Sequence, residues 1–272
     1  MSTLLPPSRA RSGDVRLAYE AAGEAGDVVL FIHGLAYDRA GWGPGPLLLA
    51  DEFRIVLFDN RGVGESDAPP GPYSVPQMAE DAVAVLDAVG AERAHVVGVS
   101  LGGYVAQELA VTRPERVDKL VLLSTAVAAG EGALPMPERG LDGLTRFPQL
   151  PREEGLRLLV ENSLGDHAVR ERPELVDEVY RYRLDHAPPL EAWAAQAAAG
   201  AGFQHTSRPI EEIGAPTLVL HGGADAIVDP RNGELLAQRI PNARLETFPD
   251  RGHLAMWQEP EWFASQLREF LA

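Results

Sequence analysis

Ser100 lies in the run Gly98-Val99-Ser100-Leu101-Gly102, which matches the pattern G-x-S-x-G. A short and mostly apolar segment (94–97) precedes this run and is typical of a buried strand, and residues 103–110 follow it with the pattern of a helix. A sharp strand-to-helix turn pushes a serine hydroxyl out from the sheet. Such a turn needs glycine two residues before and two residues after the serine, because larger side chains would collide with the neighbouring strand and helix. We therefore predict that Ser100 is a nucleophile; the alternative is a helix N-cap on an ordinary tight turn.

A serine nucleophile needs a base that accepts its proton and a carboxylate that orients the base. Two later segments, 216–222 and 243–248, have strand patterns, and they are followed by Asp225 and His253 respectively. In a parallel α/β sheet the carboxyl ends of the strands meet at one edge, which is where sites form. We expect Asp225 and His253 to meet Ser100 at this edge and to complete a catalytic triad.

Other acidic residues and histidines compete for the two partner roles. Asp229 precedes Pro230 at a predicted helix start, which favours a helix N-cap, and Asp250 is expected to shape the loop before His253. His221 and Asp225 have a spacing that metal ligands can show, but they flank a Gly-Gly turn and not a helix face, so we predict no metal site. Apart from His253 in the triad and His33 in the loop after segment 28–32, the histidines are interpreted as structural or solvated: His95, His167, His186, His205 and His221.

The ordered set of motifs resembles the α/β-hydrolase superfamily over nearly the full length of the chain. The set consists of the run around Ser100, His33-Gly34, the loop 59–67, Gly223-Ala224-Asp225 and Gly252-His253. Within the superfamily the chain is most similar to the serine-nucleophile group of small bacterial carboxylesterases and 3-oxoadipate enol-lactonase-like hydrolases. The resemblance implies the order serine, acid, histidine along the chain.

The resemblance also implies where the oxyanion of a tetrahedral intermediate would bind. The turn after Ser100 supplies one backbone N–H, that of Leu101, and the loop after the apolar segment 28–32 supplies a second, which we assign to Leu35. Gly34 would let the backbone bend toward the substrate. His33 is then interpreted as a brace of this loop, with its ring bonded to neighbouring backbone.

Strand and helix patterns alternate along most of the chain. This alternation predicts the α/β class, with a mostly parallel eight-stranded sheet and helices on both faces. We expect an opening pair of strands at 14–19 and 28–32. Helices are expected at 75–89, where Ser74 is the predicted N-cap, and later at 230–239 and 259–271.

The alternation stops between Ser124 and about residue 214, which predicts a helical cap inserted after the sixth strand. The expected core comprises residues 1–125 and 214–272, and the expected cap comprises residues 126–213. Such a cap would roof the serine, exclude bulk water and select substrates by size. Helical patterns within the cap lie at 153–162, 173–186 and 189–199.

Large side chains in and near the cap are candidates for the substrate pocket. Because an aromatic residue at helical spacing more often packs in a core, ordinary packing is the alternative for each of them. The predicted substrate-binding residues are Trp42, Tyr182, Trp193 and Trp257, with Leu141, Phe147 and Phe203 as further cap candidates.

Composition restricts the partners and the compartment. Against 40 acidic residues stand 24 lysines and arginines, and the formal net charge of −16 would repel nucleic acid and anionic bilayers. The chain contains no cysteine, no apolar run of the roughly 20 residues that a membrane span needs, and no apolar signal region near its start. We expect a cytoplasmic protein, monomeric or homodimeric, that acts on a small molecule.

These residues together predict a cofactor-free serine hydrolase that cleaves a carboxylic ester or lactone through an acyl-enzyme. One alternative is a C–C bond hydrolase of vinylogous diketones that uses the same triad. Such enzymes usually carry tryptophan directly after the catalytic histidine, where this chain has Leu254. The second alternative is a binding module on the same fold, because a fold alone does not establish catalysis.

Overall fold

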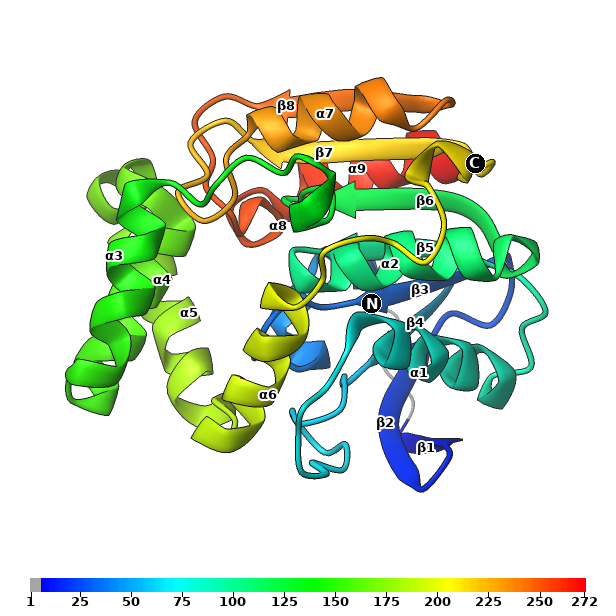
Figure 1. Ribbon diagram of the computed structural model, residues 1–272, viewed down its shortest axis with the longest axis horizontal. Helices are drawn as coiled ribbons and strands as arrows, with labels where there is room; N and C mark the ends of the chain where they lie inside the picture. The colour runs from blue at the N-terminus through cyan, green and yellow to red at the C-terminus, as the bar shows by residue number, and fades with distance from the viewer. Residues whose placement is uncertain (1–5) are drawn as a thin grey trace.

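The computed structural model describes residues 6–272 and contains an eight-stranded sheet with helices on both faces (Figure 1). The strand order is β1-β2-β4-β3-β5-β6-β7-β8; β1 and β2 run antiparallel to their neighbours, and the strands from β4 to β8 run parallel. The predicted fold class is therefore confirmed. The strands are β1 (Ser8–Ser12), β2 (Val15–Ala22), β3 (Val28–Ile32), β4 (Arg54–Phe58), β5 (Ala94–Val99), β6 (Val117–Leu123), β7 (Thr217–Gly222) and β8 (Ala243–Phe248).

The predicted pairing of segments 14–19 and 28–32 is wrong. Strand β2 lies between β1 and β4, while β3 pairs in parallel with both β4 and β5. The reason is burial: β3 is apolar throughout and almost wholly buried, which is typical of an interior parallel strand. Strand β2 exposes part of its length and belongs nearer the edge.

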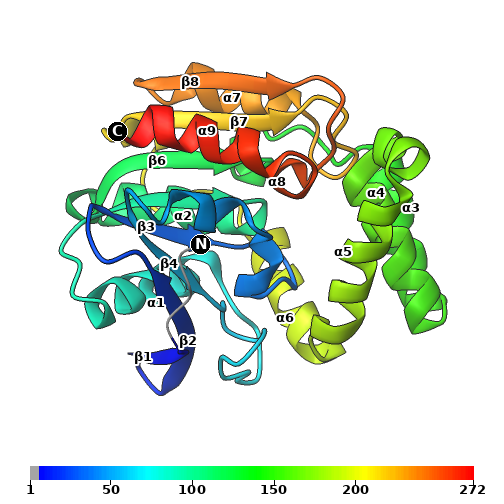
Figure 2. The ribbon, with the colours of Figure 1, turned by 180° about the vertical axis from the view of Figure 1, so that it is seen from behind.

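Two layers of helices sandwich the sheet. One face carries α1 (Val75–Ala88), α2 (Leu101–Thr112) and α7 (Arg231–Arg239), and the opposite face carries α8 (Ala255–Gln258) and α9 (Pro260–Leu271) (Figures 1 and 2). The Ser74 hydroxyl accepts a hydrogen bond from the N–H of Gln77, so the predicted N-cap of α1 is confirmed.

Four helices lie between β6 and β7 in the sequence and stand beyond the carboxyl ends of the parallel strands (Figures 1 and 2). The predicted helical cap after the sixth strand is therefore confirmed. Within residues 6–272, none of the helices has the length and apolar composition that a membrane span requires. The cap helices are α3 (Glu138–Arg146), α4 (Arg152–Glu171), α5 (Pro173–His186) and α6 (Leu190–Ala201).

Helix α3 was not predicted because glycines and prolines cluster in its part of the sequence. Packing explains one of these glycines. A Cβ atom at Gly143 would lie 2.3 Å from Nδ2 of Asn162 on α4, so a larger residue there would displace the Asn162 side chain between the two helices. Here glycine marks contact between two helices and not a loop.

Candidate active site

Ser100 stands on a sharp turn between β5 and α2, with φ 54° and ψ −120°. This conformation is strained for a residue with a side chain. A Cβ atom at Gly98 would lie 2.4 Å from the carbonyl oxygen of Gly102, and one at Gly102 would lie 2.0 Å from the carbonyl oxygen of Ile32 in β3. Both glycines of the pattern are therefore required by the packing of the turn against its own helix and the neighbouring strand.

Asp225 and His253 meet at the ends of β7 and β8. Nδ1 of His253 lies 2.8 Å from Oδ2 of Asp225, and both side chains are buried. The other carboxylate oxygen accepts hydrogen bonds from the backbone N–H groups of Ile227, at 2.8 Å, and Val228, at 2.9 Å. Burial alone would raise the pKa of Asp225, but the charge of His253 and the hydrogen bonds from His221 and His253 outweigh it, and the pKa lies well below its usual range.

His221 was interpreted as structural, but it also contacts the acid. Its Nε2 atom lies 3.3 Å from Oδ2 of Asp225 and 3.2 Å from the carbonyl oxygen of Val228. The rival acids lie elsewhere: Asp229 pairs with Arg231, and Asp250 is exposed. Asp225 is thus a carboxylate between two histidines, His221 and His253. Among residues 6–272, no group of three or more His, Asp or Glu side chains is arranged to hold a metal ion.

The loop after β3 passes directly beside Ser100. A Cβ atom at Gly34 would lie 3.0 Å from Cβ and 3.5 Å from Oγ of Ser100. Glycine at this position therefore leaves room for the serine, and the peptide groups of the loop come within reach of a substrate carbonyl held there.

Neighbouring N–H groups of this loop are already bonded. The N–H of Gly34 donates to Nδ1 of His33 at 2.7 Å, and that of Ala36 donates to Oε1 of Gln196 at 2.8 Å. Within residues 6–272, the N–H of Leu35 donates no hydrogen bond. Leu35 directly follows Gly34, which lies against Ser100, and its N–H has no acceptor among the described residues, so Leu35 stays the predicted oxyanion donor. Leu101 is the first residue of α2, where N–H groups lack intrahelical acceptors.

His33 braces this loop, as the sequence suggested. Its Nδ1 atom accepts the N–H of Gly34, and its ring stacks on Tyr37 with centroids 4.7 Å apart. Burial lowers the pKa of His33 to about 3, so the ring is neutral at ordinary pH.

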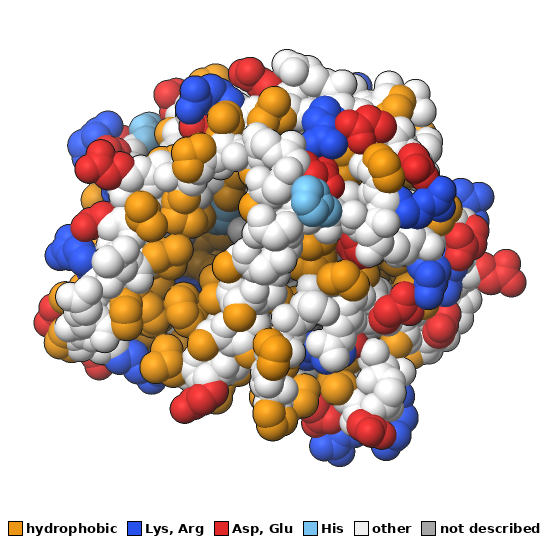
Figure 3. Space-filling model, in the orientation of Figure 1, with side chains coloured by type: hydrophobic (Ala, Val, Ile, Leu, Met, Phe, Trp, Pro, Cys, Tyr) orange, Lys and Arg blue, Asp and Glu red, His pale blue; other side chains and the backbone are white. Residues whose placement is uncertain are grey.

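A cavity of about 540 Å³ opens within the cap, and Figure 3 shows the hydrophobic side chains gathered around a hollow there. Of the predicted pocket residues, Trp193 and Phe147 line this cavity. Two arginines, Arg152 and Arg183, also line it. Arg183 is 4% exposed, and among residues 6–272 no carboxylate lies within ion-pair distance of it.

The other predicted substrate-binding aromatics are engaged elsewhere. Trp42 is fully buried and packs edge-on against Phe31, and the indole N–H of Trp257 donates to the carbonyl oxygen of Gly41 at 2.6 Å. The hydroxyl of Tyr182 donates to Oδ1 of Asp38 at 2.9 Å. Trp42 and Trp257 are thus packed in the core, whereas Tyr182 joins the cap helix α5 to the loop after β3. Of the further cap candidates, Leu141 is exposed on the surface and Phe203 is buried in the core.

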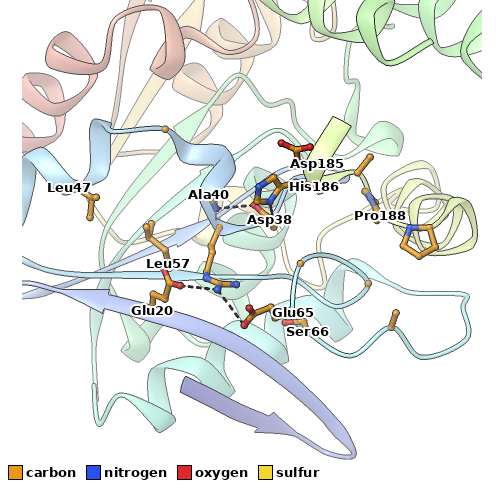
Figure 4. A pocket seen from close by; sticks show the side chains of 17 residues that line it. Glu20, Asp38, Ala40, Leu47, Leu57, Glu65, Ser66, Asp185, His186 and Pro188 are labelled. Carbon is orange, nitrogen blue, oxygen red and sulfur yellow. Dashed lines mark hydrogen bonds and ion pairs between the residues drawn. The ribbon is translucent and has the colours of Figure 1, made fainter. Parts of the chain in front are cut away.

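A larger cavity, of about 790 Å³, lies beside the loop after β3 and the end of α5 (Figure 4). Most of its charged groups pair with one another: Arg39 binds Glu20 at 2.8 Å, and Nδ1 of His186 lies 2.6 Å from Oδ2 of Asp38. Ser100, Asp225 and His253 are not among the lining residues of either cavity, and the smaller cavity is lined entirely by residues of the predicted cap.

Comparisons with known proteins agree with this fold. A model of the alpha/beta hydrolase fold family matches residues 27–260. A 2-hydroxy-6-oxononadienedioate/2-hydroxy-6-oxononatrienedioate hydrolase of Paraburkholderia xenovorans (strain LB400) is 31% identical over 271 residues, which cover 96% of this chain and 92% of that protein. The solved structure of Est816, described as an N-acyl homoserine lactone degrading enzyme, superposes with a TM-score of 0.83 at 30% identity and covers 97% of this chain and 100% of its own. A thermophilic esterase from Thermogutta terrifontis superposes with a TM-score of 0.81 at 29% identity, covering 98% of each chain.

Proposed function

The chain belongs to the alpha/beta hydrolase fold family, and from this premise we propose that it is a cofactor-free serine hydrolase that cleaves a carboxylic ester or lactone of a small molecule. The observation that carries the proposal is the hydrogen bond between His253 and Asp225 at the sheet edge that also bears the strained Ser100. A lactone-degrading enzyme and an esterase among the similar structures support the same substrate class.

The proposed reaction proceeds through an acyl-enzyme. Oγ of Ser100 attacks the carbonyl carbon while His253 accepts the serine proton, and the N–H groups of Leu35 and Leu101 stabilise the oxyanion of the tetrahedral intermediate. When the intermediate collapses, His253 donates that proton to the leaving alkoxide oxygen. Water then attacks the acyl carbon, with His253 again as base, and Ser100 is regenerated. Asp225 holds the tautomer of His253 and stabilises its charged form.

The arginines of the cap cavity support a substrate with an anionic group. Arg183 is buried and Arg152 lies near it on an otherwise largely apolar wall. A buried guanidinium without a carboxylate partner is costly, and a substrate carboxylate would offset that cost. The relative from Paraburkholderia is named for a dioate substrate, which fits the same chemistry.

That relative also favours a second candidate function, the hydrolysis of a C–C bond in a vinylogous diketone by the same triad.

The proposal also covers the domains of the chain and its location. We propose that it divides into a core (1–125 and 214–272) and a cap (126–213). The proposal also includes a cytoplasmic location, for which the acidic net charge and the absence of cysteine are the support. Either a monomer or a homodimer is compatible with this assignment.

Hydrolysis of p-nitrophenyl acetate, butyrate and octanoate tests the proposal. We expect turnover by the wild type and by Ser265→Ala, an exposed serine as matched control, and loss of turnover in Ser100→Ala. Turnover of a vinylogous diketone far above that of any ester or lactone would favour the second candidate. Failure of all three substrate classes would contradict an enzymatic role and favour a binding module.

A further inference from the structure

Ala36 follows the proposed oxyanion donor Leu35 and has an unusual backbone conformation. Its φ is +62°, although it is not glycine, and it is buried. A residue with a Cβ atom adopts this left-handed conformation only at an energetic cost, so the surrounding structure must hold it there.

The contacts that hold Ala36 come from the cap. Its N–H donates to Oε1 of Gln196 on α6 at 2.8 Å, and its carbonyl oxygen accepts a hydrogen bond from Nη1 of Arg183 on α5. Gln196 is fully buried, and its Nε2 donates to the carbonyl oxygen of Arg61 at 2.8 Å. The guanidinium of Arg183 also lies over the ring of Tyr37, 4.1 Å from its centroid. Side chains from two cap helices thus occupy both backbone polar groups of one strained residue.

The ends of this loop segment are anchored independently. On one side, Gly34 lies against Ser100 and donates to His33. On the other side, Asp38 accepts from Tyr182 and contacts His186, both on α5. Because the ends are fixed, a change of φ at Ala36 must be compensated within the short segment between them. Leu35 lies in that segment, so its N–H would turn away from the oxyanion position.

We propose that Gln196 and Arg183 are positioning residues that hold Ala36 in its left-handed conformation and thereby aim the N–H of Leu35 at the substrate oxyanion. The cap then acts on catalysis directly, and not only by selecting substrates. This inference rests on the proposed function, since it assigns part of the machinery of that same site.

Gln196→Met tests the inference because it removes both amide hydrogen bonds and keeps a similar volume. Loss of a whole oxyanion donor costs about 10²–10³ in kcat. Misplacement of one donor should cost less, so we expect kcat to fall by about 10- to 100-fold with KM nearly unchanged. The inhibition constant of an alkyl trifluoromethyl ketone, whose adduct with the serine carries an oxyanion, should rise by a similar factor. Val160→Ala, at a buried position on α4, a cap helix that makes no hydrogen bond to Ala36, controls for loss of cap stability and should keep kcat.

Ala36→Gly supplies a second, independent test. Glycine adopts positive φ without the penalty that alanine has, so the loop then needs less support from the cap. We expect Ala36→Gly to restore much of the kcat lost in Gln196→Met, leaving the double variant within about threefold of Ala36→Gly alone. A residue that merely packs the cap would show no such rescue.

The outcomes separate this inference from the proposed function. Absence of Ser100-dependent turnover in the wild type contradicts the function itself. Ser100-dependent turnover with an unchanged kcat in Gln196→Met, or with a loss that Ala36→Gly does not relieve, overturns the positioning role and leaves the hydrolase assignment standing.

Discussion

His33 makes the stability of this fold depend on pH in a way that one substitution should remove. Burial lowers the pKa of His33 to about 3 in the folded protein, whereas the ordinary value in an unfolded chain is 6.5. Its ring is neutral in the fold, where Nδ1 accepts the N–H of Gly34. His33→Asn keeps an acceptor near the position of Nδ1 but cannot titrate, so the variant isolates the contribution of the proton.

The direction and size of this pH effect follow from the coupling between proton binding at His33 and folding. Because the pKa is lowered on folding, the contribution of His33 is fully present above pH 6.5 and is lost as the pH falls from 6.5 toward 3. In that window the unfolded chain binds a proton and the folded protein does not. Each pH unit then costs about 1.4 kcal/mol, so the free energy of unfolding should fall by about 3 kcal/mol between pH 7 and pH 4 on account of His33.

Urea unfolding followed by circular dichroism at pH 7, 6, 5 and 4 measures this difference directly. Other groups titrate in both proteins and cancel when the two pH profiles are subtracted. We expect the wild type to lose about 3 kcal/mol more than His33→Asn over this range, whatever offset the substitution causes at pH 7. Parallel profiles would refute the argument, since they would mean that His33 does not stay neutral in the fold.

Three further predictions follow from the site. Asp225→Asn should keep the fold and lower kcat for ester hydrolysis by about 10⁴-fold; unchanged turnover would exclude Asp225 as the acid. Gly102→Ala should prevent the native turn and abolish activity, because the added Cβ would lie 2.0 Å from the carbonyl oxygen of Ile32. Gly214→Ala, with no heavy atom within 4 Å of its Cβ, is the matched control, and folded, active Gly102→Ala would contradict this packing argument. Trp193→Ala should enlarge the cap cavity and raise kcat/KM for p-nitrophenyl octanoate relative to acetate; an unchanged ratio would place the acyl chain elsewhere.

The sheet and the meeting of Asp225 with His253 were predictable because both depend on strand ends. A hydrophobic run shows where a strand stops, and the parallel arrangement of these strands brings their carboxyl ends to one edge. The polar strand β1 was not predicted, because only Ala10 of its residues is buried and it has no apolar run. For the same reason the edge of the sheet was predicted less well than its centre.

The roles of the cap residues could not be predicted from periodicity. Gln196 lies in an alanine-rich helix and gives no sign in the sequence that it reaches a loop 160 residues away. Trp42 and Trp257 illustrate the opposite case: they lie near the motifs in the sequence but point into the core. Periodicity identifies the buried face of a helix, but the partner of that face depends on how the cap sits on the core.

Backbone strain is concentrated at one edge of the sheet and is held there in two different ways. The non-glycine residues with positive φ among residues 6–272 are Ala36, Ser100 and Ser124, which follow β3, β5 and β6. The N–H of Ser100 donates to the carbonyl oxygen of Leu123 at 3.0 Å, and that of Ser124 to the carbonyl oxygen of Leu220 at 2.9 Å, so neighbouring strands hold both serines. Ala36 is held by side chains of the cap instead. Motion of the cap would therefore disturb the oxyanion loop and leave the nucleophile in place. Neighbouring strands hold the strained nucleophile, so its position does not depend on the cap. The proposed oxyanion donor follows a loop that cap side chains hold, so its position does depend on the cap.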